Sequence, residues 1–236
     1  MPKIWSVGKN KLAKFNQLKD MPNVFQNAGV FPDKIFLDNN GNETNFIGKW
    51  REEYFKNDHP IILELACGAG EYTVNMAQLL PNKNFVGIDI KGNRIWNGAK
   101  IALQENLNNV AFVRARIEML DTFFGTAEID EIWITFADPF PTDRRKKHRL
   151  TYTRFLEIYK KVLKPDGIIH LKTDSDVLYE FTLEMIEENK LNILYQNNDI
   201  YKNGYEESLL DLKTKYEKMH IENGKTIKYV KFQWGI

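Results

Sequence analysis

The sequence is poor in the residues that build disulfide or metal frameworks. It has one cysteine, Cys67, among 236 residues, which excludes a disulfide scaffold and any CxxC metal or redox pair. Its four histidines are scattered, without the spacing of metal ligands. No run approaches the roughly 18 apolar residues of a membrane helix, and the first 20 residues lack the apolar block of a secretory signal. We therefore expect a reduced, cytoplasmic protein that uses no metal and does not enter a membrane.

Charge is balanced over the whole chain and uneven along it. The 33 lysines and arginines against 32 aspartates and glutamates give a net charge of +1, which disfavours general binding of polyanions. Residues 144–149 nevertheless read Arg-Arg-Lys-Lys-His-Arg, whereas residues 174–188 hold six acids and no lysine or arginine. This local contrast predicts one anionic partner bound at one place.

Composition divides the chain into two parts. Residues 1–50 are polar, lysine-rich and irregular, with three prolines and a loop expected over residues 38–42. The remaining chain, with its short apolar runs, can bury a core. We expect a lysine-rich N-terminal extension over residues 1–50 and a single domain over residues 51–236.

From residue 61 onward, short apolar runs alternate with stripes of helical spacing. The runs predict strands over residues 61–66, 85–90, 110–113, 131–137 and 167–171, and a last strand over residues 226–234. Helical stripes lie between the runs, the longest over residues 93–107. Strands that alternate with helices indicate an α/β fold, whose parallel sheet is covered on both faces.

A glycine turn follows the first of these strands. Gly68 and Gly70 open the next helix, where a backbone without side chains lets a ligand approach. Asp89 ends the second strand, where an acid can accept hydrogen bonds from ribose hydroxyls. The third glycine of a dinucleotide fingerprint would fall at Thr73, and Glu64, just before the turn, would repel a pyrophosphate. The turn therefore favours a nucleoside ligand that carries a cationic amino-acid group.

A second candidate site follows the fourth strand. Asp138 comes at the carboxyl end of that strand, the edge where open α/β sheets bind ligands. Pro139 and Pro141 stiffen the loop, and Phe140 offers an aromatic face to a base. The basic run 144–149 comes directly afterwards and can anchor phosphates. This loop predicts chemistry on a base of a nucleic acid.

These motifs resemble those of known enzymes. Glu64 to Gly70 resembles motif I of class I S-adenosylmethionine-dependent methyltransferases, with an alanine for its first glycine. Asp138-Pro-Phe-Pro with the basic run is similar to the D-P-W-P-K-x-R-H-x-K-R-R segment of bacterial tRNA (guanine-N7)-methyltransferases. Further matches, within a resemblance that extends from Gly8 to Glu217, are Gly87-Ile-Asp89-Ile, Lys172-Thr-Asp174 and Thr214-Lys-Tyr-Glu217.

The resemblance implies a fold, a reaction and a set of site residues. The fold is Rossmann-like, of the class I methyltransferase type, with a mostly parallel central sheet and an antiparallel C-terminal strand. The reaction is methyl transfer from S-adenosyl-L-methionine to N7 of guanine 46 in tRNA, by a monomer or a homodimer. The implied cofactor contacts are Glu64, Gly68, Gly70, Asp89, Ala115 and Asp138, of which Asp138 is also catalytic. The implied substrate contacts are Thr142, Asp174, Thr214, Lys215, Tyr216 and Glu217, and the tRNA backbone contacts are Arg144, Arg145, Lys147 and Arg149.

Several positions depart from the pattern of this family. Ala115 stands where the family often has an acid near the adenine, so only a backbone contact is implied there. Thr142 replaces a usual substrate-contacting lysine, and Phe140 replaces the usual tryptophan. After Glu217 the chain continues as Lys218-Met-His-Ile and lacks the arginine- and glycine-rich continuation of the family.

Alternatives remain open at this stage. The Asp138 loop is also similar to the D/N-P-P-aromatic loop of methyltransferases that act on the exocyclic amine of adenine or cytosine, although the two prolines are adjacent there. A nicotinamide-dependent oxidoreductase is disfavoured by Glu64 and the missing third glycine. A third alternative is a non-enzymatic RNA-binding module. Asp174 itself suits the donor edge of guanine, but Asp174 or Ser175 could instead cap the following helix.

Overall fold

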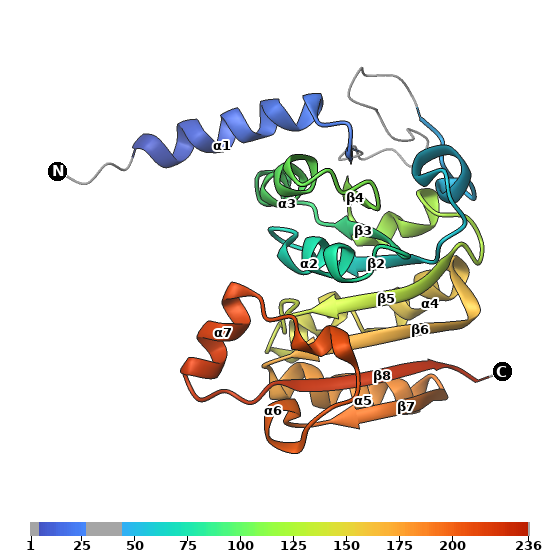
Figure 1. The fold of residues 1–236 in the computed structure, drawn as a ribbon. Helices are drawn as coiled ribbons and strands as arrows, with labels where there is room; N and C mark the ends of the chain where they lie inside the picture. Colours follow the sequence, from blue (N-terminus) through green and yellow to red (C-terminus); the bar gives the residue numbers. More distant parts are fainter. Residues whose placement is uncertain (1–4, 27–43, 236) are drawn as a thin grey trace.

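A single mixed β-sheet organises the computed structural model, which describes residues 5–26 and 44–235 (Figure 1). The strand order across the described sheet is β1-β4-β3-β2-β5-β6-β8-β7. The strands are β1 (Val24–Gln26), β2 (Ile61–Leu65), β3 (Asn84–Ile88), β4 (Val110–Arg114), β5 (Ile129–Thr135), β6 (Leu163–Thr173), β7 (Leu191–Asn197) and β8 (Lys228–Trp234). Strands β1 to β6 pair in parallel, and β8 is antiparallel to both β6 and β7. The predicted α/β fold with a mostly parallel sheet and an antiparallel C-terminal strand is confirmed.

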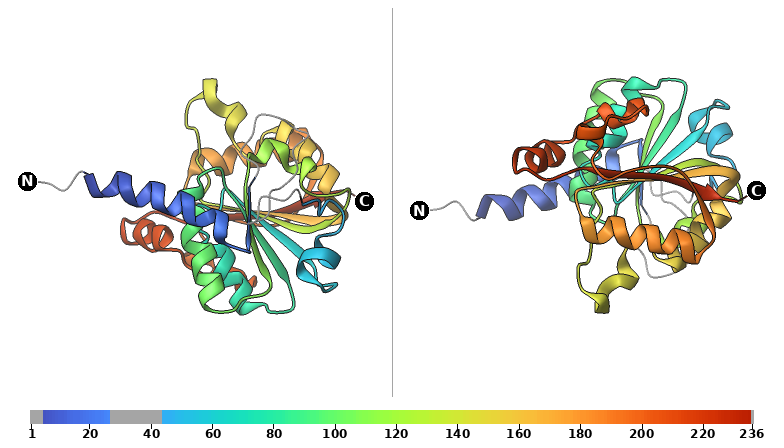
Figure 2. Two further views of the ribbon diagram at one scale, coloured as in Figure 1. Left: turned by 90° about the horizontal axis from the view of Figure 1, so that it is seen from above. Right: turned by 90° about the horizontal axis from the view of Figure 1, so that it is seen from below.

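Helices cover both faces of this sheet (Figure 2). The helices are α1 (Trp5–Gln17), α2 (Glu71–Leu79), α3 (Gly92–Gln104), α4 (Thr153–Val162), α5 (Asp176–Glu188), α6 (Ile200–Asn203) and α7 (Lys215–Glu222). Shorter helical turns are η1 (Leu18–Asp20), η2 (Trp50–Phe55), η3 (Ile117–Thr122), η4 (Asp143–His148) and η5 (Ser208–Asp211). One face packs against η2, η3, α4 and α5, and the other packs against α2, α3, α6 and η5.

The alternation of side chains along β2 explains why this strand forms at the centre. All five of its residues are buried. Ile61, Leu63 and Leu65 enter the core on one face, while Ile62 enters the core on the other. Such a strand must be apolar on both sides, as the continuous run in the sequence predicted. Glu64 is the exception, because it is an acidic residue in a buried position. Such a residue indicates a functional site.

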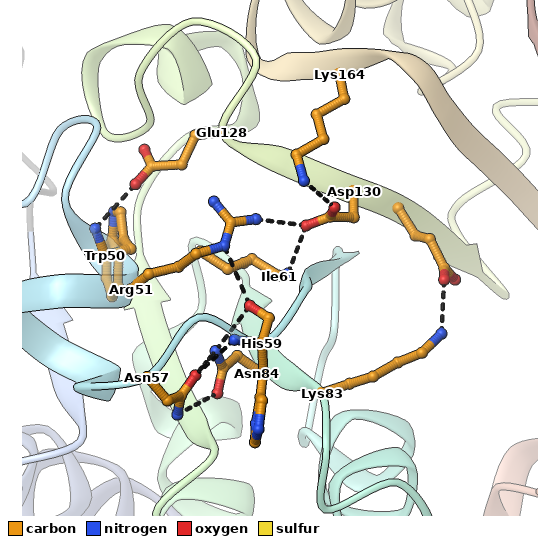
Figure 3. A network of polar contacts seen from close by, with 11 residues as sticks. Trp50, Arg51, Asn57, His59, Ile61, Lys83, Asn84, Glu128, Asp130 and Lys164 are labelled. Atoms are coloured by element: carbon orange, nitrogen blue, oxygen red, sulfur yellow. Dashed lines mark hydrogen bonds and ion pairs between the residues drawn. The ribbon is translucent and has the colours of Figure 1, made fainter.

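A polar network fixes the end of the sheet where β2 begins (Figure 3). The carboxylate of Asp130 on β5 accepts hydrogen bonds from Arg51 and from the backbone amide of Ile61, at 2.8 Å for the latter. Glu128 accepts from the backbone amide of Trp50 at 2.9 Å, which fastens η2 to the sheet. These bonds lie at the amino end of β2. The glycine turn leaves the strand from the opposite, carboxyl end.

The chain order creates a crevice at that carboxyl end. From β2 the chain builds outward through β3 and β4, and then returns to place β5 on the other side of β2. Such a reversal of direction opens a crevice between the loops that leave the two central strands. The glycine turn after β2 and the loop after β5 therefore face each other.

The ends of the chain differ most from expectation. Residues 5–17 form a helix and residues 24–26 form an edge strand, where we expected irregular chain. Because β1 pairs with β4, part of the predicted N-terminal extension belongs to the sheet, and the boundary at residue 50 stays a prediction. Strand β7 was not predicted at all. The loop predicted over residues 38–42 lies outside the described residues.

Candidate active site

A cavity of about 1070 Å³ lies at the carboxyl ends of the central strands. Five segments line it: the glycine turn with the start of α2, helix α3, the loop after β5, the start of α5, and the stretch from α7 to β8. The sequence-predicted residues among its lining are Glu64, Gly68, Asp138, Asp174, Thr214 and Tyr216. Its size is that of a site for a small molecule or cofactor.

The glycine turn is shaped by left-handed backbone conformations. Gly68 and Gly70 have φ angles of 57° and 71°, which residues with side chains adopt at a cost. A Cβ on Gly70 would lie 2.5 Å from the ring of Phe112 and 3.2 Å from the Cα of Gly98, so Gly70 also allows α2 to pack closely. Gly70, the residue before α2, has no side chain to cap the helix, and of the first amides of α2 only that of Thr73 is taken, by Glu64. The amides of Glu71 and Tyr72 are therefore available to polar groups of a ligand.

Asp89 holds the turn from the end of β3. Its two carboxylate oxygens accept from the backbone amides of Gly68 at 3.0 Å and of Lys91 at 2.7 Å. The side chain is nearly buried and is not part of the cavity lining. Each carboxylate oxygen has a second acceptor position, so these bonds orient Asp89 without exhausting it.

Glu64 is a buried acid at the wall of the cavity. Its carboxylate accepts from the hydroxyls of Thr73 and Thr135 and, at 2.8 Å, from the backbone amide of Thr73. Burial raises the pKa of Glu64 to about 7, although these hydrogen bonds favour its ionised form. Glu64 is therefore poised to respond to a cation that enters the cavity.

The loop after β5 presents Asp138 on strained backbone. Phe136 and Phe140 have φ angles of 49° and 40°, a region that bulky residues rarely occupy. Asp138 is exposed, and its carboxylate accepts from the backbone amide of Phe140 at 3.1 Å. Arg149 donates to the carbonyl oxygens of Pro139 and Phe140 at 2.9 and 3.0 Å. These bonds hold the loop in its strained shape.

The basic segment, residues 144–149, divides into exposed residues and one buried residue. Arg149 is buried, and its guanidinium also lies 4.4 Å from the ring centroid of Phe181. We expected a contact with the tRNA backbone there, but the structure gives Arg149 a contact within the loop. The residues of η4 itself, which ends before Arg149, are exposed and stand away from the sheet (Figure 2). Arg145 lies over the ring of Phe140, with 4.6 Å from the guanidinium carbon to the centroid.

Asp174 lies at the far end of the cavity, after β6. The hydroxyl of Ser175, and not Asp174, accepts from the backbone amide of Leu178 at 3.2 Å and caps α5. Asp174 instead accepts from the ammonium of Lys225, and the Nδ1 atom of His220 lies 3.6 Å from the same oxygen. Its carboxylate is thus free from helix capping and open to a ligand.

The segment 214–217 divides between the cavity and the core. The hydroxyl of Thr214 accepts from the backbone amide of Glu217 at 3.2 Å and caps α7, while Tyr216 is exposed at the cavity. Glu217 is fully buried, with the ammonium of Lys172 at 2.8 Å and the hydroxyl of Tyr201 at 2.6 Å. The backbone amide of Lys215 donates to Glu71 at 3.1 Å. Lys215 and Glu217 therefore fix α7 and do not line the cavity.

The remaining predicted residues lie outside the cavity lining. Ala115 is buried after β4, and Thr142 is exposed at the start of η4. Cys67 lines the cavity, but burial raises the pKa of its thiol well above its usual value, which makes it a poor nucleophile. His220 and Lys225 were missed, because no sequence pattern connects them to Asp174.

Two further findings concern the parts of the chain that the structure describes. Within residues 5–26 and 44–235, no three histidine, cysteine, aspartate or glutamate side chains gather closely enough to hold a metal ion. Among the helices formed by the same residues, none combines the length and the apolar character that crossing a membrane requires.

Comparisons with known proteins agree with this geometry. The family described as "Putative methyltransferase" matches residues 58–230. A tRNA (guanine-N(7)-)-methyltransferase of Christiangramia forsetii is 51% identical over 226 residues, which cover 95% of this chain and 98% of that protein. One of Cytophaga hutchinsonii, with the same name, is 37% identical over 97% of this chain and 99% of its own length.

The fold is shared more widely than the sequence. The crystal structure of the 16S rRNA methyltransferase KamB superimposes with a TM-score of 0.60 at 13% identity, over 80% of this chain and 93% of that chain. At so low an identity this likeness shows the fold, which is that of the class I methyltransferases.

Proposed function

The chain belongs to the tRNA (guanine-N(7)-)-methyltransferase family, and on that premise we propose that it methylates N7 of guanine 46 in tRNA with S-adenosyl-L-methionine as methyl donor. One observation carries the proposal. A single cavity joins the glycine turn, which suits the cofactor, to Asp138 and Asp174, which suit a base. We also propose a cytoplasmic location, because a lone reduced thiol and a tRNA substrate fit that compartment.

The residues around the glycine turn fit S-adenosylmethionine. When bound, this cofactor supplies an electrophilic methyl group on a sulfonium. The amides of Glu71 and Tyr72 at the start of α2 suit the carboxylate of its amino-acid part, and the carboxylate of Glu64 suits the ammonium. Asp89, oriented by the turn, has acceptor positions left for ribose hydroxyls. Ala115 would contact the adenine through its backbone alone.

The residues at the other end of the cavity fit a guanine. Asp174 can accept from the N1–H and the exocyclic amine, the two adjacent donors on one edge of this base. Thr214 and Tyr216 also line the cavity and complete the proposed substrate contacts. Lys215 and Glu217 act indirectly, because they hold α7 in place. Thr142 directly precedes η4, which carries the basic segment.

Methylation at N7 requires these residues to orient the guanine and to stabilise charge. It does not require a general base. N7 of guanine carries a lone pair and no proton, so no group has to remove one. The main contribution is to hold N7 in line with the methyl group. Guanine becomes cationic as it is methylated, and the carboxylates of Asp138 and Asp174 stabilise that developing charge.

The tRNA backbone must be held away from these acids. We propose that Arg144, Arg145 and Lys147, all exposed on η4, bind phosphates next to the cavity. Arg149 supports them by fixing the loop from which η4 begins.

Analysis of methylated nucleosides tests the proposal. Transfer RNA incubated with the protein and methyl-labelled cofactor should yield labelled 7-methylguanosine, and a tRNA with adenine at position 46 should yield none. Label in N6-methyladenosine or in a methylated cytidine would overturn the N7 assignment in favour of an amino-methyltransferase. Label that persists in 7-methylguanosine after the replacement would overturn position 46 alone.

A further inference from the structure

Two basic side chains, one in the last turn of α7 and one just beyond that helix, lie against Asp174 in the cavity. The ammonium of Lys225 donates to its Oδ2 atom, and the imidazole of His220 lies 3.6 Å from the same oxygen. The side chain of Lys225 is half exposed, and all three residues line the cavity. The position expected to receive the guanine edge is therefore a carboxylate–ammonium pair rather than a lone carboxylate.

The backbone fixes Lys225 in this position. Gly224, with a φ of 73°, ends α7 in the left-handed conformation, and its amide donates to the carbonyl of Ile221 at 2.9 Å. The amide of Lys225 donates to the carbonyl of His220 at 3.0 Å. These two bonds form the helix-ending motif that glycine favours. Since Glu217 anchors the same helix through Lys172, the backbone that carries Lys225 is held at both ends of α7.

The pair matches the hydrogen-bonding groups of guanine. Along one edge, guanine presents the O6 acceptor, the N1–H donor and the exocyclic amine donor. An ammonium has three donors and a carboxylate only acceptors. With one N–H given to Asp174, Lys225 keeps two for a neighbouring acceptor. Adenine reverses the first two groups, with a donor at position 6 and an acceptor at N1, and would oppose both members of the pair.

We propose that Lys225 donates a hydrogen bond to O6 while Asp174 accepts from N1–H and the amine, so that the two residues together select guanine. This inference rests on the proposed function and names the residue that makes it specific. Rejection by unpaired buried polar groups is the strongest form of such selection.

Three other basic side chains line the cavity, and one of them, Arg94, belongs to α3. Lys228 is nearly buried and bonds to Asp176 at 2.8 Å and to the hydroxyl of Thr226 at 2.6 Å. His220 stacks on Phe136, with ring centroids 6.1 Å apart and 22° between the planes. Lys225 is the ammonium of this lining that bonds to Asp174 and can share its donors with a base.

A cycle of protein and substrate changes tests the contact. The protein change is Lys225→Met, which keeps the length of the side chain and removes its donors. The substrate change is 6-thioguanine at the target position of the tRNA, which keeps N1–H and the amine but replaces O6 with a weak acceptor. Lys218→Met, on the exposed side of the same helix, is the matched control. Lys225→Arg restores a donor and serves as the rescue variant.

The quantity to compare is the catalytic efficiency, kcat/KM, with which the methylated base forms. With guanine, Lys225→Met lowers this efficiency by about tenfold, the scale of a hydrogen bond to a charged group. On 6-thioguanine, the catalytic efficiency of the wild type and of Lys218→Met falls by a similar factor. The efficiency of Lys225→Met falls no further on this base. Lys225→Arg recovers both the efficiency on guanine and the sensitivity to sulfur.

Three outcomes would overturn the inference. Equal sensitivity of the wild type and Lys225→Met to the sulfur substitution would show that Lys225 does not contact O6. A wild-type or faster rate of Lys225→Met on guanine would show that the base displaces Lys225. Absence of 7-methylguanine with the wild type would overturn the proposed function itself, and with it this inference, so the two failures are distinguishable.

Discussion

The titration of Glu64 predicts how cofactor affinity depends on pH. Burial raises the pKa of Glu64 to about 7, and the ammonium of a bound cofactor favours the ionised form. At pH 6 only about a tenth of the free protein then carries the charged carboxylate, against about nine-tenths at pH 8. S-adenosylhomocysteine should therefore bind about tenfold more tightly at pH 8 than at pH 6, with release of a proton on binding at the lower pH.

Isothermal calorimetry at several pH values checks this expectation. Glu64→Gln should bind more weakly, by about 1.5–3 kcal/mol for a lost charged hydrogen bond, and with no dependence on pH between 6 and 8. His220→Gln, which removes the imidazole at the other end of the cavity, should keep the wild-type profile. Wild-type affinity that is constant from pH 6 to pH 8 would refute the raised pKa of Glu64, and wild-type affinity in Glu64→Gln would refute the placement of the ammonium beside it.

The raised pKa of Glu64 has the opposite effect on the stability of the free protein, which falls as the pH rises. The folded state holds a proton on Glu64 that the unfolded chain, with a pKa of 4.5, has already released. This contribution to the free energy of unfolding is fully present below pH 4.5 and is lost as the pH rises through about 7. Glu64→Gln should abolish that part of the pH dependence in urea denaturation.

The remaining predictions concern catalysis, tRNA binding and the buried ion pair. Asp138→Asn and Asp174→Asn should each lower the single-turnover rate at saturating tRNA more than they lower tRNA affinity, because most affinity comes from phosphates; wild-type rates would remove both acids from the mechanism. Neutralising the three exposed cations proposed at 144, 145 and 147 should reduce the slope of log K against log salt by about two to three, with unchanged cofactor affinity. An unchanged slope would identify η4 as a solvated turn. Lys172→Met should cost about 3–5 kcal/mol in urea denaturation, because Glu217 is left buried without its cation, and adding Glu217→Leu should recover most of that loss.

The strands that could be predicted are those whose burial requires a continuous run of apolar residues. The central strand β2 is apolar throughout because both of its faces are covered. Strand β7 carries five exposed residues between two buried ends, and its apolar residues Ile193, Leu194 and Tyr195 are among the exposed ones, so its pattern does not reflect a buried face. Strand β1 is three residues long and is held by its pairing with β4. Edge strands of this kind are specified by a neighbour rather than by their own composition.

The candidate site residues likewise divide into those that the sequence could identify and those that depend on tertiary structure. Glu64, Asp138 and Asp174 were identifiable because acids at strand ends share one edge of a parallel sheet. Arg149 and Glu217 carry charges that sequence alone suggests are exposed, yet both are buried by partners distant in the chain or in the loop. Lys225 lies in a loop without periodicity, and only tertiary structure brings it to Asp174.

The arrangement of β7 and β8 bears on how this enzyme family can diversify. Asn197 at the end of β7 lies opposite Tyr229 near the start of β8, so residues 198–227 leave the sheet and return to it at one place. Helix α7 and Lys225 both lie within this excursion, whereas Asp174 lies outside it, between β6 and α5. Such a detour can be exchanged, lengthened or shortened while the two strands stay paired, because the cost of closing a loop grows slowly with its length. The contacts proposed for Lys225 and α7 can thus change without moving the strands whose ends carry Glu64, Asp138 and Asp174.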